Sequence, residues 1–248
     1  MVSFALDLAG QHWDINISKK ELETVHLPLL KKMTRKAAYK AGRYVVFIAG
    51  PPGSGKTTIG ALWETLAREH DLHVSVQTLP MDGFHFPNAE LDARTIIHDD
   101  ESMSLRKIKG APESFDLEMI SRSLRDICSG RELAWPKYDR QIHDPVSDAI
   151  PVIVEGLIVI EGNYLLLDEP GWRELKPMAD LTIFIECDEA LTRENLLARA
   201  ERGGRSRRNA VRHYEFSDRS NWERIMGRRL ESDVVLRVED SRRLVCVK

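Results

Sequence analysis

The chain is poor in several features that would mark particular classes of protein. Its three cysteines, Cys128, Cys187 and Cys246, are far apart and match neither a disulfide framework nor a metal-ligand spacing. There is no run of about 18 apolar residues, and the N-terminus lacks the basic start and apolar core of a signal peptide. The formal net charge of −3 leaves no excess of basic residues for nucleic acid or an anionic membrane. We therefore expect a cytoplasmic protein whose partner is a small molecule, with no nucleic acid or membrane partner.

One stretch carries a specific chemical signature. An apolar segment at 44–49 with strand character is followed by the pattern G-x-x-x-x-G-K-[ST] from Gly50 to Thr57 and then by a helix-forming segment. Glycines let backbone N–H groups turn toward a phosphate, and the helix N-terminus adds partial positive charge. We expect Lys56 to reach the β/γ-phosphates of ATP and the Thr57 hydroxyl to ligate Mg²⁺. The residues expected to bind the nucleotide here are Gly50, Pro51, Pro52, Gly53, Ser54, Gly55, Lys56, Thr57 and Thr58.

The rest of the pattern predicts an α/β fold behind a small N-terminal extension. Residues 3–17 alternate around Gly10-Gln11, which favours a hairpin, and 19–40 look helical with a break at Pro28. Further strands are predicted at 73–79, 152–154, 157–160, 181–186, 234–238 and 244–247, and helices at 56–69, 116–128, 189–200 and 220–229. Such alternation predicts a three-layer α/β/α fold with a mostly parallel sheet and ligands at the carboxyl ends of the strands. We assign 1–41 to the extension and 42–248 to a P-loop domain with a lid at about 193–220.

Three acidic residues follow apolar runs, where this architecture places its chemistry. They are Asp82, Glu161 and Asp168. A P-loop enzyme needs a carboxylate at a strand end to organise Mg²⁺ or its water shell. A kinase also needs a base that orients the acceptor hydroxyl and takes its proton. The chain thus offers more acids than there are roles.

Several stretches resemble the superfamily of phosphoribulokinase, uridine kinase and bacterial pantothenate kinase. They are the P-loop, Asp82-Gly83-Phe84 with Pro87-Asn88, residues 109–116, residues 136–143, Glu161-Gly162, and residues 193–204. Their order across 44–225 is more specific than any one of them. The nearest branch resembles kinases described as nucleoside-kinase-like or fructose-transport-linked. The resemblance implies transfer of the γ-phosphate of ATP to a hydroxyl of a small metabolite, such as a sugar, a nucleoside or a pantothenate-like acceptor.

The resemblance also implies roles for individual residues. Asp82 would be the catalytic base and would contact the acceptor, and Glu161 would act on the Mg²⁺ shell. Residues 152–156 nearly repeat 158–162, so Glu155 is the rival for that position; we favour Glu161 because the family pattern continues after it. Tyr138 and His143 would contact the acceptor, with Asp139 a weaker candidate.

Two arginines are expected to hold phosphate oxygens from the lid. The resemblance favours Arg199, with a catalytic role, and then Arg193, since a guanidinium makes bidentate contacts with such oxygens. Gly203-Gly204 would act as a hinge for lid closure.

Other interpretations remain open at this point. The run 165–170 resembles the Walker-B strand of transporter ATPases, but an L-S-G-G-Q signature is missing, and the GTPase motif N-K-x-D is absent. A regulatory ATP-binding protein without an acceptor is the main alternative. The stretch 88–109, with Asp99, Asp100 and Glu101, looks like a long loop that reshapes the acceptor pocket. The apolar N-terminal hairpin would either cover the core or form a homodimer interface.

Overall fold

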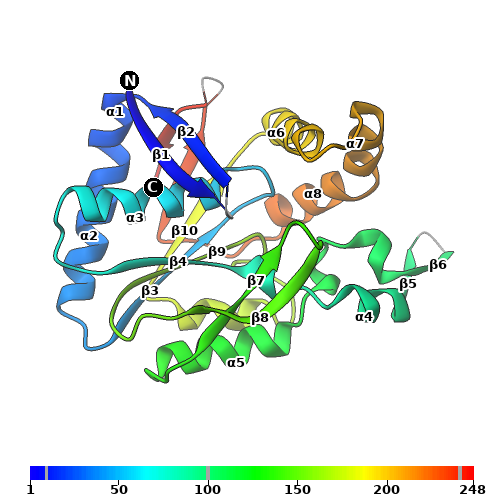
Figure 1. The fold of residues 1–248 in the computed structure, drawn as a ribbon, viewed down its shortest axis with the longest axis horizontal. Coiled ribbons are helices and arrows are strands. Elements are labelled where there is room, and N and C mark those ends of the chain that lie inside the picture. The colour runs from blue at the N-terminus through cyan, green and yellow to red at the C-terminus, as the bar shows by residue number, and fades with distance from the viewer. Residues whose placement is uncertain (9–10, 99–100, 240–241) are drawn as a thin grey trace.

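The computed structural model describes residues 1–8, 11–98, 101–239 and 242–248. Its centre is a six-stranded sheet in the order β12-β11-β10-β3-β9-β4 (Figure 1). All neighbouring strands are parallel except the β11-β12 pair. The strands are β3 (Arg43–Ala49), β4 (Val76–Pro80), β9 (Gly156–Gly162), β10 (Leu181–Glu186), β11 (Val234–Val238) and β12 (Leu244–Cys246). This arrangement confirms the predicted three-layer α/β/α fold with a mostly parallel sheet.

The central strand β3 shows how the sequence builds the layers. Successive side chains of a strand point to opposite faces, and both faces of this one are buried. Val46 and Ile48 join a hydrophobic cluster with α2 (Leu27–Ala38), α3 (Lys56–Glu69) and the N-terminal hairpin. Val45, Phe47 and Ala49 join the cluster under α5 (Leu117–Cys128), on the other face. A continuous apolar run is therefore required in β3, and it ends where the P-loop begins.

The N-terminal segment forms the predicted hairpin, β1 (Val2–Leu8) with β2 (Gln11–Ile17). Gly10 of the predicted turn lies outside the described residues. Phe4, Leu6 and Ile17 are buried in the same cluster as α3 and the sheet, so the hairpin covers the core. A homodimer and the boundary at residue 41 both stay predictions.

The predicted helix break at Pro28 is wrong. The chain is helical from α1 (Lys19–Glu21) through a π-helical turn (Leu22–His26) into α2. A proline inside a regular α-helix clashes with the carbonyl four residues earlier. The wider turn accommodates it, since the Leu27 N–H bonds to the Leu22 carbonyl, five residues back.

The stretch 88–109 is not the loop that its polarity predicted. It folds into α4 (Asn88–Ala93), the β5 (Thr95–His98) and β6 (Glu101–Ser104) hairpin, and a 3₁₀ turn (Leu105–Ile108). A small hydrophobic cluster holds it together, built on Leu91, Leu105, Ile108 and Ala111. Asp99 and Asp100 lie outside the described residues. These few apolar positions are too widely spaced to give a periodic signal.

A second antiparallel hairpin was also missed. It consists of β7 (Ala134–Asp139) and β8 (Asp144–Pro151), and the predicted strand at 152–154 is wrong. Val154 is 61% exposed there, because the chain turns before it enters β9. Prolines at 136, 145 and 151 interrupt the strand pattern in sequence, since proline cannot donate a ladder hydrogen bond.

Helices α6 (Glu189–Arg202), α7 (Arg207–His213) and α8 (Arg219–Gly227) follow β10, with a π-helical turn (Tyr214–Asp218) before α8. Leu196, Leu197, Ala210 and Tyr214 form a small cluster between α6 and the following segment. The predicted helices at 189–200 and 220–229 are thus confirmed, and the role of this region as a lid stays a prediction. Across the described part of the chain, no helix is both long and apolar enough to cross a bilayer.

Candidate active site

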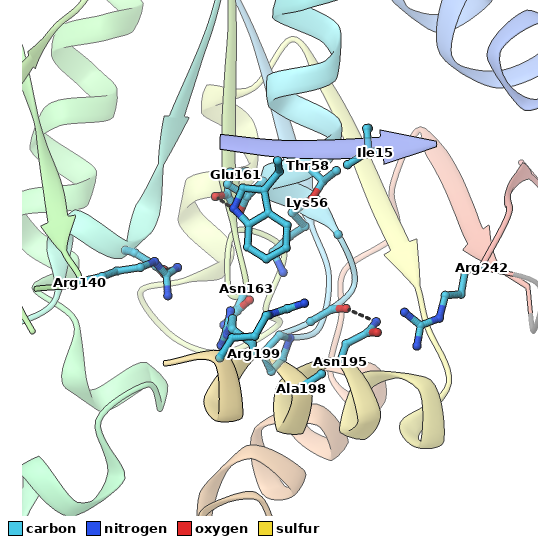
Figure 2. A pocket seen from close by; sticks show the side chains of 17 residues that line it. Ile15, Lys56, Thr58, Arg140, Glu161, Asn163, Asn195, Ala198, Arg199 and Arg242 are labelled. Atoms are coloured by element: carbon cyan, nitrogen blue, oxygen red, sulfur yellow. Dashed lines mark hydrogen bonds and ion pairs between the residues drawn. The ribbon is translucent and has the colours of Figure 1, made fainter. Parts of the chain in front are cut away.

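A cavity of about 430 Å³ lies where the carboxyl ends of β3, β4 and β9 meet (Figure 2). The P-loop and the first turn of α3 form its floor. Asp82 enters from the turn after β4, and Glu161 and Asn163 enter from the end of β9. Helix α6 supplies Asn195, Ala198, Arg199 and Arg202 from the opposite side. Segments far apart in sequence therefore build one site.

The P-loop adopts the conformation that its glycines permit. Gly53 and Gly55 have φ values of 79° and 93°, in the left-handed region that favours glycine. A Cβ on Gly53 would also approach the Thr192 carbonyl oxygen of α6 to 3.2 Å. Asn195 of α6 donates a 2.9 Å hydrogen bond to the Gly53 carbonyl. The loop is therefore fixed against α6 while its amides stay at the N-terminus of α3.

The Lys56 side chain folds back along the loop. Its Nζ donates to the carbonyls of Gly50 and Pro51 at 2.9 and 2.8 Å. Burial lowers the pKa of Lys56 to about 8, while the nearby carboxylates of Glu161 and Asp82 act in the opposite direction. A phosphate placed against the loop would offer this buried amine the full negative charge that neutral carbonyls do not.

Thr57 and Glu161 form a set of oxygen ligands beside Lys56. The Thr57 hydroxyl donates to Oε1 of Glu161 at 2.8 Å. Burial, and then the charge of Asp82, raise the pKa of the Glu161 carboxyl. Hydroxyl and carboxylate oxygens are the donors that Mg²⁺ prefers, and a divalent cation would relieve the crowding of negative charge. The residues present therefore fit a magnesium site completed by phosphate and water.

The register of the sheet decides between the two rival glutamates. Glu161 lies within β9, opposite Ile48 of β3 and Pro80 of β4, so it shares the edge with the P-loop. Glu155 is exposed and precedes β9, at the other end of the strand. Glu161 is thus the glutamate at the carboxyl end.

Asp82 is held by close packing of its turn on β7. It lies in a 3₁₀ turn (Met81–Phe84), and a Cβ on Gly83 would come within 2.2 Å of the Pro136 carbonyl oxygen. The Trp135 indole N–H also donates to the Pro80 carbonyl at 2.8 Å. The carboxylate itself is 42% exposed and faces the cavity. A fixed but open carboxylate suits contact with a ligand.

Two arginines face this carboxylate and the P-loop. Arg199, predicted from the lid helix, lines the cavity, and Figure 2 shows it beneath Lys56. Desolvation, and then the charge of Arg140, lower the pKa of Arg199. Arg140, from the turn between β7 and β8, lies 3.9 Å from Asp82. The sequence analysis missed Arg140, although it lies inside the matched segment 136–143.

Tyr138 and His143 do not line the cavity. The Tyr138 hydroxyl donates to the His143 carbonyl at 2.8 Å within the β7-β8 turn. The Tyr138 ring lies under Lys109, whose Nζ is 4.7 Å from the ring centroid. Their role in acceptor binding stays a prediction.

Arg193 and Asp168 also point elsewhere. Arg193 lies 3.6 Å from Glu215 and stacks over the Tyr214 ring, away from the P-loop. Asp168 pairs with Arg173 at 3.2 Å. The run 165–167 before it forms no strand, which contradicts the transporter-ATPase interpretation.

The phosphoribulokinase / uridine kinase family model matches residues 45–242. The chain belongs to this family. The YggC protein of Escherichia coli strain K12 is 39% identical over 239 residues, 96% of each chain. The pantothenate kinase of Lactiplantibacillus plantarum is 32% identical over 65% of this chain, and the match spans about half of that enzyme (51%). The solved structure of a "putative fructose transport system kinase" from Silicibacter sp. TM1040 is 30% identical, with a TM-score of 0.73 over 83% of this chain and 98% of that chain.

These relatives confirm the predicted resemblance. The family, together with its kinase members, supports a nucleotide-binding P-loop kinase that acts on a small molecule.

Proposed function

We propose that this protein transfers the γ-phosphate of ATP to a hydroxyl group of a small metabolite. The observation that carries the proposal is the meeting of an open carboxylate, Asp82, with the P-loop lysine and a lid-helix arginine in one cavity. A protein that only bound ATP would need the loop but not a base at its outer end.

Each residue of the site would have its own role in the reaction. The loop amides and Lys56 hold the triphosphate, and Arg199 positions the transferring group against them. Asp82 orients the acceptor hydroxyl and takes its proton, as the hydroxyl oxygen bonds to the γ-phosphorus and the bond to the ADP oxygen breaks. The Arg140 pair at 3.9 Å is longer than a hydrogen bond, which leaves the carboxylate oxygens of Asp82 free to accept from the substrate. Mg²⁺, held by Thr57 with Glu161 acting on its water shell, would supply positive charge to the phosphates.

The acceptor class is taken from the family and its relatives. We propose a sugar, a nucleoside or a pantothenate-like alcohol. The segment 88–109, folded as α4 and the β5-β6 hairpin, would then border the acceptor side, because Asn88 binds the β7-β8 turn through the His143 carbonyl at 2.9 Å.

The test is transfer of labelled phosphate. The protein is incubated with Mg²⁺ and γ-labelled ATP, first with a bacterial metabolite extract and then with single sugars, nucleosides and pantothenate. The expected result is a labelled small molecule and ADP release that depends on the same compound. Tight ATP binding without any labelled product, or ADP release that responds only to a protein partner, would favour the regulatory alternative and contradict the proposal.

A further inference from the structure

The N-terminal hairpin reaches into the nucleotide cavity. Its inward face packs on α3 through Phe4, Leu6 and Ile17. Trp13 and Ile15 lie on the same face of β2, since they alternate with Ile17 along the strand. Both line the cavity, and Figure 2 shows Ile15 on a strand that crosses above the P-loop. One end of the hairpin is thus anchored on the core, and the other covers the site.

The cavity has two chemically different ends. Asp82, Glu161 and Arg140 mark the end where the phosphoryl group would be transferred. Figure 2 shows Arg242, Asn195 and Ile15 on the side opposite Arg140. A nucleotide whose triphosphate lies on the P-loop with its γ-phosphate toward Asp82 must extend its nucleoside toward this opposite side.

Trp13 offers a surface for that nucleoside. It is the one aromatic side chain among the described residues that line the cavity. The indole is half-buried and is covered by the guanidinium of Arg202, whose Cζ lies 4.6 Å from the ring. A guanidinium and a nucleobase are both flat groups that stack on an indole. Trp13 therefore provides a ring on which a base can stack in the same cavity as the P-loop.

We propose that Trp13 stacks on the base of the bound nucleotide, with Ile15 packed beside it, so that the N-terminal hairpin forms part of the nucleotide site. This inference rests on the proposed use of a nucleoside triphosphate. The hairpin lies before residue 45, where the family model begins, so the contact is a property of this chain and of relatives that carry the same segment. The YggC alignment covers 96% of this chain, so it must include at least part of the hairpin.

The test compares ligands with and without a base. The dissociation constants of Mg²⁺-ATP and of Mg²⁺-tripolyphosphate are measured by calorimetry for the wild type, Trp13→Ala, Trp13→Phe and His12→Ala. His12 is 73% exposed on the other face of the same strand and serves as the matched control. Trp13→Ala should weaken ATP binding roughly 5- to 150-fold, the range of one base-aromatic stack, and change tripolyphosphate binding less than about twofold. Trp13→Phe should retain most of the ATP affinity, and His12→Ala should match the wild type.

Tryptophan fluorescence gives a second measurement, which needs only the wild type and the conservative variant Trp13→Phe. ATP should quench the emission of the wild type more than that of Trp13→Phe, and tripolyphosphate should not. Equal losses for the two ligands in Trp13→Ala, or unchanged ATP affinity, would overturn the inference, as would equal quenching in wild type and Trp13→Phe. A selective loss of ATP affinity in a protein that phosphorylates no acceptor would support the inference while the proposed function failed.

Discussion

Replacing Asp82 with asparagine tests the proposed base directly. The change keeps the size of the side chain and its place in the 3₁₀ turn against β7, but removes its ability to accept a proton. General-base catalysis contributes about 10²- to 10⁴-fold, so kcat should fall by that factor, or about 3–5 kcal/mol in the activation free energy.

ATP binding should respond far less. The Asp82 side chain is 42% exposed, so its charge acts through a high effective dielectric. Removing it should change the binding free energy by about 1 kcal/mol or less, toward tighter binding, because a negative charge near the triphosphate is lost. The catalytic loss therefore exceeds the binding change, and the two can be measured separately.

The assay is a coupled measurement of ADP release with whichever acceptor the labelled-phosphate test identifies, together with calorimetric ATP binding. Asp168→Asn is the matched control, since Asp168 also follows an apolar run but pairs with Arg173 outside the cavity. An exposed pair of this kind contributes little, and kcat should stay within about twofold of the wild type. A kcat for Asp82→Asn within tenfold of the wild type would refute the base assignment, as would a loss of ATP binding that accounts for the whole effect.

Three further changes test the loop, the turn and the scaffold. Lys56→Ala should weaken ATP binding and lower kcat together, by about tenfold or more each, because a charge-assisted contact to phosphate is lost; unchanged binding by calorimetry would contradict the phosphate role. Gly83→Ala should reduce stability by about 1–3 kcal/mol and lower activity, because the added methyl group meets the Pro136 carbonyl at 2.2 Å; a wild-type midpoint in urea would contradict this. The Glu169 carboxylate accepts two hydrogen bonds from Arg224, at 2.7 and 2.5 Å. These bonds are the largest cause that lowers the pKa of Glu169 below its ordinary 4.5. Glu169→Gln should therefore reduce the unfolding free energy at pH 7 by about 1–3 kcal/mol. A carboxyl group whose pKa is lower in the folded state stabilises the fold at pH values above its unfolded-state pKa, and this stabilisation is lost as the pH falls through its folded-state pKa. The difference in unfolding free energy between wild type and Glu169→Gln should therefore shrink below about pH 4.5. A difference that stays constant in urea unfolding from pH 3 to 7 would contradict this prediction.

Local sequence predicted the elements that depend on local physics. Helix 56–69 and strand 181–186 agree with the structure at both ends, because the helix repeats its apolar residues at the helical period and the strand is a short apolar run. The β7-β8 hairpin and the fold of 88–109 could not be predicted in this way. Their apolar positions are few, and Pro136 breaks the strand pattern, so their pairing depends on neighbours far away in sequence.

The residues of the candidate site also fall into those that the sequence predicted and those that only the tertiary structure selected. Lys56, Thr57, Asp82, Glu161 and Arg199 were predicted, and the structure brings them to one cavity. Apart from the family resemblance, the sequence offered no reason to prefer Asp82 and Glu161 over Asp168 as site carboxylates. The sheet register made that choice, since it aligns the ends of β3, β4 and β9 and leaves Asp168 on a separate turn.

The sequence by itself was enough to predict a phosphate-binding loop at residues 50–58, because consecutive backbone amides and the next lysine can make such a site without help from distant residues. Only the tertiary structure placed Arg140 beside Asp82 and brought Trp13 to the wall of the same cavity. Both residues lie far from the loop in sequence, one before it and one after it, and no local pattern records which distant side chains the packing of a hairpin on a helix will bring together.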